Sequence, residues 1–200
     1  MIFIYNNTKI SCNVPQKSGI TSVLNIMAYP FLKKQLSKNK TRQTLSADVF
    51  PHWFNFYQGE IFESCDIKIA IVRDPIKRIV SVYNDRILKK NKDQLKKQIS
   101  NFDNFTDNFI DIRQKAKDVR LHSRPQIEYI GLDSSVYDYI FCTGEINTKF
   151  KEIIEEYSKT KIINAHNNRS DQKEIDLTST QVDFYKNFYA LDYKHYGKYF

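Results

Sequence analysis

A lysine and several hydroxyl groups are gathered in one short segment near the start of the chain, from Pro15 to Ser22. The segment reads Pro-Gln-Lys-Ser-Gly-Ile-Thr-Ser, and it separates a β-branched run from a run with helical apolar spacing. Backbone N–H groups at a helix start carry partial positive charge, and a lysine with hydroxyl groups beside them can surround a phosphate. An ordinary strand-to-helix turn, capped by Thr21 or Ser22, is the alternative. The predicted anion-binding residues are Lys17, Ser18, Gly19, Ile20, Thr21 and Ser22.

A second basic segment follows the nearly continuous apolar stretch at residues 67–72. Arg73 comes directly after this stretch, and Pro75 suits the first turn of a helix on which Ser81 would lie. Ligands bind at the carboxyl ends of strands in open α/β sheets, and an arginine offers a bidentate fork for phosphate. The sequence therefore predicts that Arg73 and Ser81 bind a phosphate, whereas Asp74 is interpreted as a helix cap.

The elements expected around these two segments alternate between strand and helix. Apolar and β-branched runs predict strands at residues 2–5, 9–14, 67–72, 137–142 and 161–163. Helical spacing predicts helices at residues 21–36, 75–90, 145–157 and 178–190. This alternation predicts an α/β fold, in which a central parallel sheet is flanked by helices. A length of 200 residues fits a single domain that covers residues 1–200.

The composition narrows the class of protein further. The formal net charge of +8 and a pI near 9.2 favour an anionic partner. No apolar run approaches the roughly 18–20 residues that a membrane-spanning helix needs, and the N-terminus does not read as a signal peptide. The cysteines lack metal-ligand spacing, so no metal is expected. The sequence thus predicts a soluble, cytoplasmic protein without a transmembrane segment; the cysteines are Cys12, Cys65 and Cys142.

Together, the two basic segments resemble the signatures of sulfotransferases that use 3′-phosphoadenosine 5′-phosphosulfate (PAPS), especially the carbohydrate branch. The family's R-D-P-x-x-R-x-x-S-x-Y signature is matched by Arg73, Asp74, Pro75, Arg78, Ser81 and Tyr83. Its P-K-[ST]-G-x-[TS]-S loop is matched from Lys17 to Ser22, although Gln16 stands between Pro15 and Lys17. The family's later segments are similar to residues 121–126, 137–145, 168–170 and 185–197.

The resemblance implies a P-loop-like three-layer fold and an enzyme with PAPS as its co-substrate, a carbohydrate or other hydroxyl-bearing acceptor, and no metal. It implies that Lys17 meets the charge that develops on the leaving group. His52 is similar in place to the histidine bases of uronic-acid 2-O-sulfotransferases, and it is the predicted general base; Glu60 and Glu63 are the alternatives. His122 and Arg124 are predicted either to contact the acceptor or to have a structural role. Without an anchor or disulfides, the chain is similar to a compact microbial or viral form.

Two other classes of function stay open at this point. An ATP-dependent kinase of small molecules would also bind a nucleotide, but Lys17 precedes Gly19 here, unlike the Walker A order, and no Walker B carboxylate follows Val72. A non-catalytic basic module for polyanions would explain the charge alone. The lysine runs are not interleaved with aromatic residues, however, so we expect no nucleic-acid partner.

Overall fold

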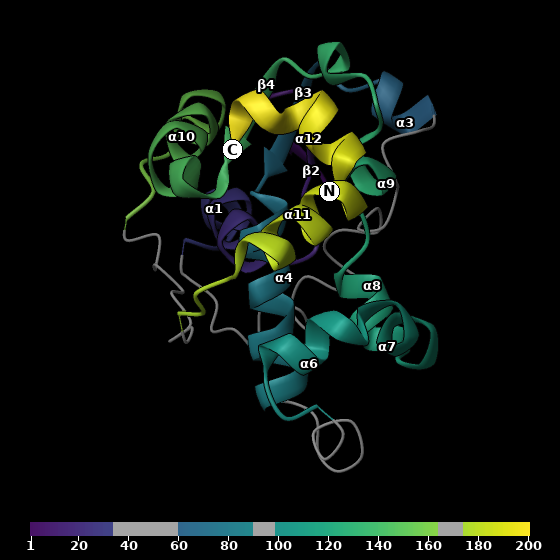
Figure 1. Ribbon diagram of the computed structural model, residues 1–200. Coiled ribbons are helices and arrows are strands. Elements are labelled where there is room, and N and C mark those ends of the chain that lie inside the picture. Colours follow the sequence, from purple (N-terminus) through teal and green to yellow (C-terminus); the bar gives the residue numbers. More distant parts are fainter. Residues whose placement is uncertain (34–59, 90–98, 164–173) are drawn as a thin grey trace.

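The computed structural model describes residues 1–33, 60–89, 99–163 and 174–200. Among these residues, a four-stranded sheet in the order β1-β2-β3-β4 lies at the centre (Figure 1). β1 (Ile2–Tyr5) pairs antiparallel with β2 (Thr8–Asn13), and β2 pairs parallel with β3 (Ile67–Val72). β3 in turn pairs parallel with β4 (Tyr139–Cys142). The predicted α/β fold with a mostly parallel sheet is confirmed.

The hairpin at the N-terminus is the most local part of the sheet. Asn6 and Asn7 have φ angles of 47° and 69°, which are left-handed values that asparagine tolerates well. A two-residue turn of this kind matches the twist of the strands on either side, so β1 and β2 pair directly. The hairpin predicted around these asparagines is therefore confirmed.

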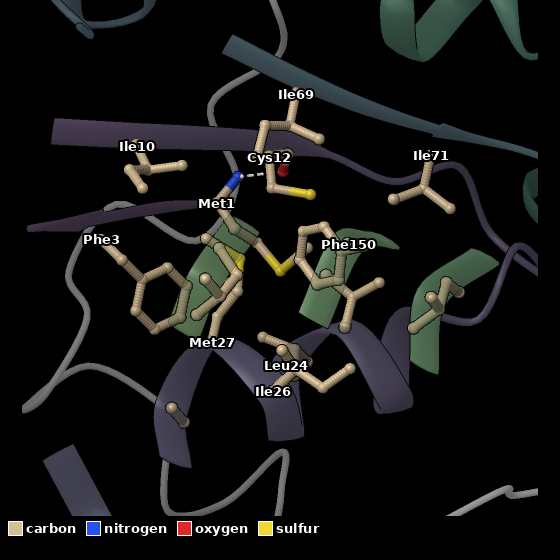
Figure 2. Close-up of a cluster of buried hydrophobic side chains, with 14 of the residues drawn as sticks. Met1, Phe3, Ile10, Cys12, Leu24, Ile26, Met27, Ile69, Ile71 and Phe150 are labelled. Atoms are coloured by element: carbon tan, nitrogen blue, oxygen red, sulfur yellow. Dashed lines mark hydrogen bonds between the residues drawn. The ribbon is translucent and has the colours of Figure 1, made fainter. Parts of the chain in front are cut away.

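The first face of the sheet is covered by α1 (Ile20–Leu32), η4 (Ile146–Phe150) and α10 (Lys151–Ser158). Side chains alternate across a strand, so Ile69 and Ile71 of β3 point to this face. Figure 2 shows them above Leu24 and Met27 of α1. The N-terminal ammonium donates a hydrogen bond to the Cys12 carbonyl oxygen at 3.0 Å in the same cluster.

The opposite face is covered by shorter helices. Ala70 and Val72 of β3 pack there with Phe62, Tyr137 and Tyr196, which are all buried. The helices on this side give the molecule its third layer (Figure 1), as the P-loop-like architecture requires. The elements of this face are α3 (Glu60–Glu63), α9 (Ile127–Ile130), η2 (Ser134–Val136), α12 (Ala190–Tyr196) and η5 (Gly197–Tyr199).

A separate core of aromatic and aliphatic side chains packs among the helices that follow β3. Phe105, Phe109 and Tyr185 are each fully buried in it, and the Phe109 ring meets the other two edge-on, a geometry that aromatic pairs favour. Arg113 lies over the Phe188 ring, 4.7 Å from its centroid. The elements that contribute are α4 (Pro75–Val82), η1 (Tyr83–Lys89), α6 (Phe102–Asp107), α7 (Phe109–Lys115), α8 (Lys117–His122) and α11 (Ser179–Phe188).

Several predicted elements differ from those observed. Residues 161–163 form no regular secondary structure and lie outside the sheet, so the strand predicted there is wrong. The N–H of Ile162 donates instead to Glu155 Oε1 at 2.6 Å. The helix predicted at residues 75–90 is α-helical only to Val82 and continues as the π-helix η1. In the described part of the chain, no helix combines the length and the apolar character needed to cross a membrane.

Candidate functional site

Three loops meet where the parallel strands end. Asn13 of β2 lies opposite Ala70 of β3, and Val72 of β3 lies opposite Cys142 of β4, so the carboxyl ends of all three strands share one edge. A Cβ built on Gly19 would lie 2.5 Å from Ile146 Cδ1, which shows how closely the first loop approaches the segment after β4. This edge is where open α/β sheets bind ligands.

The loop after β2 turns sharply before α1 begins. Lys17 and Gly19 have φ angles of 66° and 82°, and the Ser18 N–H donates to the Pro15 carbonyl oxygen at 3.2 Å. Gly19 is the N-cap of α1 and has no side chain to accept a hydrogen bond, so the alternative in which Thr21 or Ser22 caps the helix is wrong. The N-cap residue of α1 therefore makes no side-chain hydrogen bond to the first N–H groups of the helix at the mouth of the loop.

Two arginines from the second basic segment hold this loop by its backbone. Arg73 Nη1 donates to the Lys17 carbonyl oxygen at 2.8 Å, and Arg78 Nε donates to the Gln16 carbonyl oxygen at 3.2 Å. Asp74 caps α4 by accepting from two backbone N–H groups, as predicted. The structure therefore brings the two basic segments together, and it gives Gln16 a role as a backbone anchor.

The two guanidinium groups lie in an environment that disfavours their charge. Burial lowers the pKa of Arg73, and the neighbouring charge of Arg78 lowers it further. Arg78 is 1% exposed, and burial also lowers its pKa, although Asp192 Oδ2 lies 3.8 Å from its Nη1. Burial raises the pKa of Asp192 in turn. Because both shifts run against the effect of pairing, desolvation outweighs the attraction between Arg78 and Asp192, and an added anion would stabilise the positive charge here.

The hydroxyl groups of the two segments have different surroundings. Ser18 is fully buried, and within the described ranges its Oγ has no hydrogen-bond partner. A buried hydroxyl without a partner is costly, and a ligand oxygen would relieve that cost. Thr21 and Ser22 are half-buried in the first turn of α1. Ser81 is 2% exposed and lies one turn after Arg78 on α4.

The Lys17 ammonium is the first member of a series of charged side chains in contact, which the sequence alone does not predict. Lys17 Nζ lies 2.7 Å from Asp85 Oδ2, which lies 3.5 Å from Arg86 Nε. Arg86 Nη1 lies 2.9 Å from Asp118 Oδ2, and Arg86 Nη2 contacts His122 Nε2. Asp85 is four residues after Ser81, so helical spacing was the signal that could have found it.

His122 and Arg124, the predicted acceptor contacts, both contact arginine side chains within the protein. His122 Nδ1 is 2.7 Å from the Asp118 carbonyl oxygen, and burial together with the Arg86 charge lowers the pKa of His122. A neutral ring that donates from Nδ1 and accepts at Nε2 satisfies both contacts. The Arg124 carbonyl oxygen accepts from Arg78 Nη2 at 3.0 Å, while the Arg124 side chain is partly exposed near Glu128. A role of either residue in acceptor binding stays a prediction.

The candidate bases lie in different parts of the chain. His52 lies outside the described residues. Glu60 is exposed at the start of α3. Glu63 Oε2 lies 3.6 Å from Lys68 Nζ, at the amino end of β3, and the strand separates Lys68 from Arg73 by about 16 Å. The position of Glu63 therefore weighs against a role beside the loop.

Replacing Gly19 with alanine should destabilise the protein by about 1–3 kcal/mol, because the left-handed backbone disfavours a Cβ that would also meet Ile146. For a chain of this size, the melting temperature should fall by roughly 2–12 °C. Gly197→Ala is the matched control, since a Cβ there meets nothing within 4 Å. Adding Ile146→Val should relieve part of the Gly19→Ala loss, and equal melting temperatures for Gly19→Ala and wild type would contradict the close approach.

Comparison with known proteins agrees with this geometry. A model of the sulfotransferase family matches residues 1–199 of the chain. Comparison with curated proteins and with solved structures gave no match. The family match covers both basic segments and the strands that position them.

Proposed function

Because this chain belongs to the sulfotransferase family, we propose that it transfers a sulfuryl group from PAPS to a hydroxyl group of a carbohydrate. Membership of the family makes the chain a sulfotransferase and implies an acceptor with a hydroxyl group. The identity of the donor, the carbohydrate nature of the acceptor and the general base are the parts that we propose.

The proposal rests on one hydrogen bond between the two basic segments, which Arg73 donates to the Lys17 carbonyl oxygen. This hydrogen bond joins a loop suited to one phosphate with an arginine suited to another, as a nucleotide with groups at both its 5′ and 3′ positions requires. The buried Ser18 hydroxyl, which no side chain or backbone group satisfies in the described part of the chain, fits the same ligand.

In this proposal, the loop holds the 5′-phosphosulfate and the second segment holds the 3′-phosphate. Backbone N–H groups at Gly19 and Ile20 face the 5′ group, together with the side chains of Lys17, Ser18, Thr21 and Ser22. Arg73 and Ser81 bind the 3′-phosphate. The lowered pKa of Arg73 supports this assignment, because an anion placed there restores the stability of its charged form.

The chemistry that we propose is an in-line displacement at sulfur. The acceptor oxygen forms the new S–O bond while the bond from sulfur to the bridging oxygen of the nucleotide breaks. Lys17 stabilises the negative charge that develops on this bridging oxygen. His52 takes the proton that the acceptor hydroxyl loses, since an imidazole with an ordinary pKa of about 6.5 is a suitable base near neutral pH.

Nucleotide preference provides the direct test. Adenosine 3′,5′-bisphosphate, the expected product, should bind roughly 10–150-fold more tightly than ADP, because one charge-assisted hydrogen bond contributes about 1.5–3 kcal/mol. Isothermal titration calorimetry measures both affinities. Ser81→Ala should weaken bisphosphate binding about tenfold while ADP binding stays unchanged. We prefer this variant to Arg73→Ala, because Arg73 also holds the Lys17 carbonyl oxygen.

The matched control is Ser11→Ala, another buried serine, which lies on β2 near the Ile67 carbonyl oxygen. It should leave the preference for the bisphosphate intact. Equal affinities for ADP and the bisphosphate in the wild-type protein would reject the assignment of Arg73 and Ser81. Tight binding that needs ATP and Mg²⁺ would favour a kinase instead.

A further inference from the structure

We infer that Asp85 is a positioning residue that holds the Lys17 ammonium in the donor-free enzyme and releases it when the donor binds. The inference rests on the proposed function, since it requires that Lys17 contacts the donor. Its consequence is that Asp85 sets how tightly the donor and the product nucleotide bind. The ion pair at 2.7 Å is the starting observation.

The exchange involves the side chain of Lys17 and leaves its backbone where it is. That backbone is fixed in a left-handed conformation, and its carbonyl oxygen accepts from Arg73 Nη1 at 2.8 Å. The side chains of Lys17 and Asp85 are 16% and 24% exposed, so the pair is screened by solvent only in part. Rotation about the bonds of the lysine stem can therefore carry the ammonium from Asp85 to an anion in the loop without a change in the backbone.

The position of Asp85 along the chain links it to the second basic segment. Ser81 lies on α4, and Asp85 follows four residues later on η1, so both lie on one side of the same continuous helix. The pairing of Asp85 with Lys17 thus connects the two segments through side chains, in addition to the backbone bond made by Arg73.

A second cation, Arg86, can neutralise the charge of Asp85 once the Lys17 ammonium has moved away. Arg86 Nε lies 3.5 Å from Asp85 Oδ2, and Arg86 is itself fixed by Asp118 at 2.9 Å and by His122. Leaving a partly buried carboxylate without a counter-ion would be costly. Because Arg86 stays in place, the release of Lys17 does not leave Asp85 without a counter-ion, which limits the free-energy cost of the exchange.

The sign of the effect follows from competition. Asp85 and the anionic groups of the nucleotide compete for the same ammonium, so the carboxylate weakens nucleotide binding. Asp85→Asn, which keeps the shape and removes the charge, should therefore bind adenosine 3′,5′-bisphosphate about three- to tenfold more tightly. Asp85→Glu, which keeps the charge, should bind it as the wild type does. The KM for PAPS should fall by a similar factor in Asp85→Asn without a rise in kcat, because Lys17 is released before the chemical step.

The test is a double-mutant cycle read by calorimetry with adenosine 3′,5′-bisphosphate. The gain in affinity from Asp85→Asn should appear when Lys17 is present and vanish in the Lys17→Met background, because Asp85 acts through Lys17. Asp111→Asn is the matched control. It removes the same charge from an exposed ion pair with Lys115 on α7, and it should leave nucleotide affinity unchanged.

The outcomes separate this inference from the proposed function. If the wild-type protein does not bind the bisphosphate in preference to ADP, the proposed function fails. If it does, and Asp85→Asn binds no more tightly, the inference alone fails. A gain of the same size with and without the Lys17→Met replacement would mean simple repulsion between Asp85 and the nucleotide, and it would also overturn the inference. A 100-fold loss of kcat in Asp85→Asn with unchanged affinity would overturn it as well, since Asp85 would then take part in the chemical step.

Discussion

Replacing Lys17 with methionine should lower kcat by about 10²–10³-fold, which is the range observed when one group that stabilises developing charge is removed. Methionine keeps the apolar stem and removes the ammonium. Lysine and methionine pay the same conformational cost for the left-handed backbone at this position, so the loop should keep its shape. Single-turnover kinetics with PAPS and an accepted acceptor measures the effect on the chemical step.

Lys33→Met is a closely matched control for this variant. Lys33 is also a lysine with a left-handed backbone, at a φ of 51°, but it lies at the other end of α1 and pairs with Thr160. Its replacement should leave kcat unchanged. Circular dichroism should show both variants folded. A folded Lys17→Met enzyme with near-normal kcat would reject the role given to Lys17.

Replacing His52 with glutamine should lower kcat by about 10²–10⁴-fold, the usual contribution of a general base, with little change in nucleotide affinity. A base must be unprotonated to accept the acceptor proton. The wild-type kcat/KM should therefore fall as the pH drops below an ordinary histidine pKa of about 6.5, and this limb should disappear in His52→Gln.

Variants of other residues serve as comparisons for His52→Gln. His195→Gln changes a half-buried histidine on α12 and should preserve both the rate and its pH profile. Glu60→Gln and Glu63→Gln should have small effects. If either glutamate variant loses activity while His52→Gln keeps it, the base is misassigned, although the donor-site assignments do not depend on it.

Local patterns predicted the parts of the fold that short segments decide on their own. The asparagine pair produced the β1–β2 hairpin, and the apolar run at residues 67–72 became the central strand β3. Asp74 capped α4 because its side chain reaches N–H groups only two and three residues away. The loop and Arg73 also met as expected, since both follow parallel strands whose carboxyl ends lie at one edge of the sheet.

Contacts between residues far apart in the sequence could not be predicted from local patterns. Asp192 accepts from the N–H groups of Gln126 and Ile127 and lies near Arg78, and no local pattern connects these positions. The helices between residues 99 and 130 have four to seven residues each, too few turns for a clear apolar period. Residues 161–163 have strand-like composition, but they lie outside the sheet, and Glu155 takes the N–H of Ile162 instead.

The neighbouring positive charges of Arg73 and Arg78 have a consequence for attempts to engineer this protein. Without an anion, the folded state carries a partly buried charge at Arg73 that both desolvation and the charge of Arg78 disfavour. Selection for heat resistance alone would then reward neutral side chains at that position that still donate a hydrogen bond to the Lys17 carbonyl oxygen, and these hardier variants would have lost the charge that binds the nucleotide. A screen for thermostability should therefore be run with the nucleotide present, so that tolerance to heat and binding are selected together.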